Sequence, residues 1–191
     1  MTFDLQTARF VSGLFVFPQG TGITAKQFDP NSSSGPTAGI GFHFNNVFVD
    51  QRGIFVSGRK LPALVCIQSK GISLAATLPL GTHNARPFKD GVLYNDTESD
   101  ALCWHTPSRR VTIPVPKYPH VDLTNLDMDD SKLARQAFGR GLCPLSDTLI
   151  AGGSSPTTIS VYDLEAEKII RSINISMDVR NAVHGMAIWP Y

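Results

Sequence analysis

Charge is scarce in this sequence. Only 17% of its 191 residues are aspartate, glutamate, lysine or arginine, whereas about 25% is usual for a soluble domain. The formal net charge at pH 7 is +1. Nucleic-acid-binding proteins normally carry a strongly basic face, so this balance argues against DNA or RNA as a partner.

Long hydrophobic runs are also missing. No stretch approaches the roughly 18 consecutive apolar residues that a membrane-spanning helix needs. The first residues, MTFDL, have neither the basic region nor the apolar region of a secretion signal. We therefore expect a cytoplasmic protein that does not bind a membrane.

Cysteine is rare. Cys66, Cys103 and Cys143 are scattered, and no C-x-x-C pair is present, which argues against a zinc knuckle. Cys66 and Cys103 fall at the same position of two similar apolar segments. We expect all three to be small buried hydrophobes with free thiols in a reducing compartment.

What the sequence does contain is a degenerate internal repeat of about 40 residues. Three segments align: RGIFVSGRKLPALVCIQ from Arg52, DGVLYNDTESDALCWHT from Asp90 and DTLIAGGSSPTTISVYD from Asp147. A weaker copy, GLFVFPQGTGITAKQFD, begins at Gly13. Each copy has a Gly or Asp turn, a short apolar strand, a small polar hinge and a second strand. A hairpin repeat of this length predicts an all-β protein, most often a β-propeller.

We expect one β-propeller-type domain over residues 1–191, an array of about four four-stranded blades that forms a small closed ring or part of a larger one. The long spacing before the last copy places an insertion at residues 117–136, with a short helix that begins near Asp129 or Asp130. The predicted blades and closing strand cover residues 8–38, 39–82, 83–136, 137–183 and 184–191.

Several of these segments resemble a known family. THNARPFKDGVLYNDTESDALCW, GRGLCPLSDTLIAGGSS, ISVYDLEAEKII and HGMAIWP are similar to a bacterial β-propeller family of unknown function. That family is distantly related to gluconolactonase-like and NHL-type propellers of about six blades. The resemblance covers residues 39–191, implies a propeller fold and brings no catalytic residues. This chain has about four copies instead, so a fragment of a larger protein is an alternative.

The candidate site follows from the predicted architecture. In a propeller the first strand of every blade lines the central channel, so polar residues at the starts of these strands converge. Three of the five histidines recur at such starts, and an arginine takes the corresponding place in the remaining blade. The predicted ligand-binding residues are His43, His83, Asn84, Arg86, Arg140 and His184.

Three interpretations of this cluster stay open. His43, His83 and His184 fit a divalent metal, because neutral imidazoles from separate strands can meet on an axis. Arg86 and Arg140 fit an anionic small molecule, because guanidinium groups bind oxyanions with paired hydrogen bonds. Alternatively, the side chains are structural and satisfy backbone carbonyls. No cofactor other than a divalent metal is suggested by the sequence.

We therefore predict a ligand-binding or protein-interaction module whose partner, a small molecule or a protein, binds at the channel face. The alternative is a metal-dependent hydrolase or lyase of the gluconolactonase-like kind that uses the same channel. The Gly152–Ser155 stretch is interpreted as a hairpin hinge, because it lacks the G-x-S-x-G pattern of a nucleophile elbow. Phenylalanines crowd the N-terminal third, and we expect homo-oligomers through exposed blade edges.

Overall fold

The computed structural model describes residues 1–189 apart from 21, 34, 37–40 and 127–134. It is all-β, with fifteen strands and one short 3-10 helix, His120–Asp122. The helix predicted near Asp129 or Asp130 begins outside the described residues. In the described part of the chain, no helix has the length and apolar character needed to cross a membrane.

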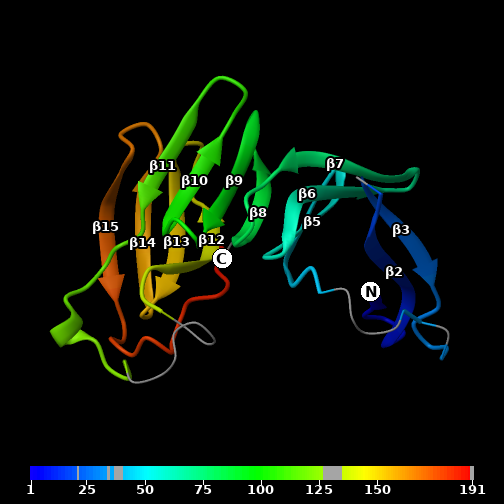
Figure 1. Cartoon of the computed structure of the whole chain (residues 1–191), viewed down its shortest axis with the longest axis horizontal. Helices are drawn as coiled ribbons and strands as arrows, with labels where there is room; N and C mark the ends of the chain where they lie inside the picture. The colour runs from blue at the N-terminus through cyan, green and yellow to red at the C-terminus, as the bar shows by residue number, and fades with distance from the viewer. Residues whose placement is uncertain (21, 34, 37–40, 127–134, 190–191) are drawn as a thin grey trace.

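The strands form four antiparallel sheets (Figure 1), in which each strand pairs with its neighbours in sequence. The first sheet is three-stranded: β1 (Thr2–Asp4), β2 (Arg9–Gln19) and β3 (Gly22–Phe28). The second contains β4 (Phe44–Asp50), β5 (Gly53–Gly58), β6 (Leu61–Gln68) and β7 (Gly71–Thr77). The third contains β8 (Thr82–Phe88), β9 (Gly91–Asp96), β10 (Ala101–His105) and β11 (Arg110–Pro114). The fourth contains β12 (Phe138–Pro144), β13 (Leu149–Ser155), β14 (Thr158–Asp163) and β15 (Lys168–Asn174).

Three details of the predicted repeat are wrong. Residues 184–189, expected to belong to a closing strand, are not in a strand. Gly13, expected to open a hairpin, lies inside β2, where it faces the Phe28 ring of β3. The Gly152–Ser155 hinge is instead the second half of strand β13. Small residues are needed there because the space beside Gly152 and Gly153 is filled by Tyr162 and Val183.

The sheets are joined by apolar cores between their faces. The third and fourth sheets share a cluster that includes Leu93, Leu102, Ile150 and Tyr162, all nearly inaccessible to solvent. A second cluster lies between the second and third sheets. It contains Phe55, Leu64, Cys66, Ala85, Tyr94 and Cys103. All three cysteines are free and buried, as expected.

The first strands of the last three sheets lie next to one another. β8 contacts β4 on one side and β12 on the other. The first sheet contacts the second through β3 and β7, and the first and fourth sheets lie at opposite ends of the molecule (Figure 1). The described strands therefore form an open row of sheets.

Asparagine side chains connect neighbouring sheets. From the second sheet, the Asn45 amide donates to the Thr82 carbonyl (2.8 Å) and the Asn46 amide to the Ala85 carbonyl (2.9 Å). From the third sheet, the Asn95 amide donates to the Gly141 carbonyl at 3.2 Å. Each bond satisfies a main-chain acceptor at a sheet junction.

Replacement of Asn95 by alanine is expected to lower the free energy of unfolding by about 1–3 kcal/mol, because Asn95 is 2% exposed and its loss leaves a buried carbonyl without its donor. Urea denaturation measures the change. The exposed Asn181 serves as a control, and Asn181→Ala should shift stability by less than about 0.5 kcal/mol. Equal stability of the two variants would contradict a junction role for Asn95.

Candidate functional site

The first strands of the last three sheets share a local distortion. Strand register shifts between Phe44 and Asn46 in β4, between His83 and Arg86 in β8, and between Gly139 and Gly141 in β12. A bulge of this kind bends a strand and redirects the side chains within it. The residues that lie inside the three shifts are Asn45, Asn84, Ala85 and Arg140.

A polar pocket of about 260 Å³ lies beside these bulges. Four chain segments contribute to it: β4, β8, β12 and residues 184–186 near the C-terminus. Its polar side chains are Asn45, Asn46, Asn84, Arg86 and His184, and its apolar ones are Val47, Phe48, Leu142 and Met186. No aspartate or glutamate is among the described residues that line it.

Arg86 is the cationic side chain that lines this pocket. Its guanidinium lies 4.1 Å from the centre of the Phe48 ring, a cation–π contact. Its Nε is buried and has no hydrogen-bond partner among the described residues. Burial lowers the pKa of Arg86, but arginine stays protonated in proteins. The pocket therefore contains a charged donor with unused hydrogen-bonding capacity.

Arg140 and His184 form a pair next to it. Nη1 of Arg140 lies 3.1 Å from Nε2 of His184. Arginine has only donors, so Nε2 must accept and the imidazole must be neutral. Burial, and then the positive charge of Arg140, lower the pKa of His184. The Asn84 amide donates to the main-chain carbonyls of both residues and thereby holds β8, β12 and the C-terminal segment together.

His83 is buried, with 7% of its surface exposed. Nδ1 lies 3.1 Å from the Gly81 carbonyl and therefore carries the proton. Burial lowers its pKa to about 4, and the charges of Arg140, His43 and Arg59 act in the same direction. His83 is thus a neutral side chain, packed edge-on against Phe138, and lies outside the pocket lining.

The structure brings some of the predicted residues together and separates others. Asn84, Arg86 and His184 line one pocket, and Arg140 contacts His184. His43 and His83 lie side by side, with ring centres 6.3 Å apart, but neither lines this pocket. Among the described residues, no group of three or more His, Cys, Asp or Glu side chains is placed to hold a metal ion. The three-histidine metal site stays a prediction.

Asn45, Asn46 and Phe48 also line the pocket and were not predicted from the sequence. A signal for them was present. Asn45 and Asn46 follow His43 closely, as Asn84 follows His83, and alignment of the two strand starts would have included them.

No protein-family description matches the chain, and no curated protein matches it.

Proposed function

We propose that this chain is a β-propeller-type module that binds a small anionic molecule in the pocket beside the bulged first strands. The observation that carries the proposal is Arg86, a charged and half-buried side chain that lines the pocket with its Nε unpartnered among the described residues. An oxyanion in the pocket would accept hydrogen bonds from this guanidinium, and charge-assisted hydrogen bonds of this kind are stronger than neutral ones.

The surrounding charges favour the same ligand class. Burial is the main cause that lowers the pKa of His83, His184 and Arg140. Nearby positive charges lower each of these pKa values further. Charges of one sign in a low-dielectric recess attract ligands of the opposite sign. We therefore assign this pocket to an anion and not to a metal cation.

The size of the pocket limits the ligand. About 260 Å³ is less than the roughly 300–1,000 Å³ of sites for drug-sized molecules. This volume suits inorganic phosphate or a carboxylate of a few carbon atoms.

The propeller part of the proposal rests on the arrangement of the sheets. Each sheet is a meander of neighbouring strands, and the first strands β4, β8 and β12 lie next to one another. Successive blades of a propeller have this order. A ligand at the first strands would then bind near the axis of the array.

Calorimetric titration with phosphate, acetate and succinate tests the proposal. We expect saturable binding of at least one of them, and about tenfold or greater weakening in Arg86→Met, which keeps an unbranched side chain near Phe48 but removes the charge. Arg110→Met is the control, because Arg110 is exposed on β11 and does not line the pocket.

Unchanged anion affinity in Arg86→Met would overturn the assignment. Stoichiometric Zn²⁺ binding that His184→Ala abolishes and Arg86→Met leaves intact would instead favour the metal-dependent alternative.

A further inference from the structure

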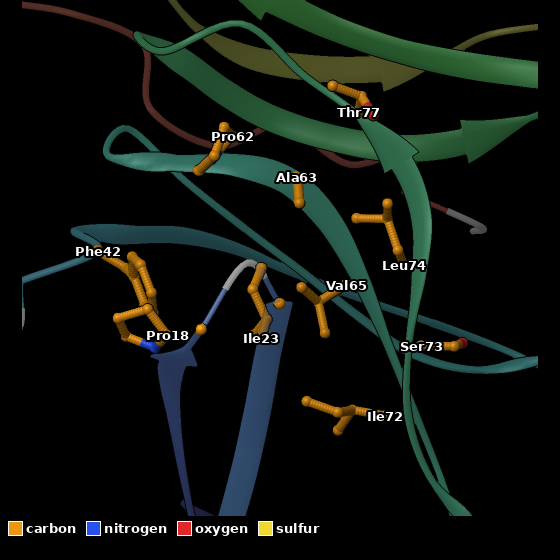
Figure 2. A pocket seen from close by; sticks show the side chains of 12 residues that line it. Pro18, Ile23, Phe42, Pro62, Ala63, Val65, Ile72, Ser73, Leu74 and Thr77 are labelled. Atoms are coloured by element: carbon orange, nitrogen blue, oxygen red, sulfur yellow. The ribbon is translucent and has the colours of Figure 1, made fainter.

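A second and larger pocket, of about 430 Å³, lies between the first and second sheets. Figure 2 shows Ile23 of β3 and Val65 of β6 close together, with Phe42 and Pro18 on one side and Leu74 of β7 on the other. Ile23 and Phe42 also pack against the buried cluster formed by Leu61, Ala63 and Val65. The pocket therefore has walls from both sheets and from the segment that connects them.

Small side chains create the space. Gly20, Gly22 and Ala63 all line the pocket. On its other face the second sheet is closely packed, with Phe55 and Leu64 almost fully buried against the third sheet. Protein interiors are normally filled to the density of organic crystals. The space is therefore a local feature of one face and does not reflect loose packing of the whole sheet.

The chemistry of the lining selects the ligand. Among the described residues, no charged side chain lines this pocket, and Ser73 and Thr77 supply its only side-chain hydroxyls. An ion that entered would lose its hydration without gaining a partner, which is costly. An apolar molecule would gain free energy from the surface that it removes from water.

We propose that this pocket binds an uncharged, mainly apolar small molecule at a site separate from the anion pocket. Its volume falls within the roughly 300–1,000 Å³ typical of ligand sites. Ser73 and Thr77 lie four residues apart on β7, so either hydroxyl alone can pair with a hydroxyl or carbonyl group of such a ligand. The proposal is independent of anion binding, because the two pockets share no lining residue.

Fluorescence titration with N-phenyl-1-naphthylamine, a neutral probe, tests the proposal on the full chain. We expect a saturable increase in emission. 8-Anilinonaphthalene-1-sulfonate has the same rings with an added sulfonate and serves as the charged counterpart, which should bind this site more weakly.

Two variants locate the probe. Gly22→Leu adds a side chain to the lining, and its Cβ would make an ordinary contact, with the Gln19 carbonyl oxygen nearest at 3.7 Å. Leu74→Arg places a charge at a lining position that is 62% exposed. Each change should weaken binding of the neutral probe about tenfold. The matched controls are Gly41→Leu, where a Cβ meets no atom of the described part of the chain within 4 Å, and Ile173→Arg, at a position that is 60% exposed on β15.

Three results would overturn the proposal. The first is no saturable binding of the neutral probe. The second is equal affinity of the neutral probe for the pocket variants and their controls. The third is a charged probe that binds at least as tightly as the neutral one and loses its affinity in Gly22→Leu.

Discussion

Replacement of Gly91 by alanine is expected to lower the free energy of unfolding by at least about 2 kcal/mol. A Cβ at this position would lie 2.2 Å from the His105 carbonyl oxygen and 2.9 Å from its carbon. Both are main-chain atoms of the neighbouring strand, so the hairpin of β9 and β10 must shift to admit a single methyl group. Guanidinium denaturation of the two proteins measures the loss.

Gly53 begins β5 as Gly91 begins β9, and it provides a parallel test. Its φ is +145°, in a region that favours glycine, and a Cβ would lie 2.6 Å from the Ile67 carbonyl oxygen. Gly53→Ala should therefore destabilise the protein comparably. Gly41→Ala is the control, because a Cβ there meets no atom of the described residues within 4 Å. Equal stability of all three variants would contradict the prediction that a Cβ cannot be accommodated at Gly53 and Gly91.

Stability is also expected to fall by about 3 kcal/mol between pH 6.5 and pH 4 because of His83. Its pKa drops from 6.5 in the unfolded chain to about 4 in the folded protein, and each pKa unit is worth about 1.4 kcal/mol. The unfolded chain binds a proton first as the pH falls, so the stabilisation is complete above pH 6.5 and decreases down to about pH 4. Urea denaturation at a series of pH values measures this slope.

His83→Gln is expected to flatten the slope, even if its stability is lower at every pH. His120→Gln, at an exposed histidine of the 3-10 helix, should leave the slope as it is. The lowered pKa values of His105 and His184 contribute in the same direction and persist in both variants. If the slope of stability against pH is the same in His83→Gln and in the unchanged protein, His83 is not the cause of the pH dependence.

Local sequence patterns were enough to predict the all-β class and most hairpins. Gly53 and Gly91, in the turns of two of the aligned copies, begin second strands of their sheets as expected. These features depend on turn-forming residues and on the alternation of apolar and polar residues over short segments. Gly13 was predicted to be a turn residue, but it lies inside a strand and packs against the Phe28 ring. The residues next to it in the sequence do not distinguish these two roles of a glycine.

The candidate site was predictable only in part. Their places at the starts of predicted first strands indicated that Asn84, Arg86 and His184 would come together, and they line one pocket. Spacing says nothing of burial, however, and His83 lies inside the protein while the neighbouring His43 is exposed. The bulges of β4, β8 and β12 decide which side chains reach the pocket, and they arise from register between strands, which a single sequence does not display.

The asparagine bonds between sheets have a consequence for divergence. In each, the donor is a specific amide, but the acceptor is a main-chain carbonyl that any residue provides. One side of every such junction is therefore fixed and the other is free to mutate. A unit joined in this way can be duplicated beside a copy that has already drifted in sequence, and the new junction will still form. This asymmetry would allow neighbouring sheets to keep their junctions while their sequences diverge.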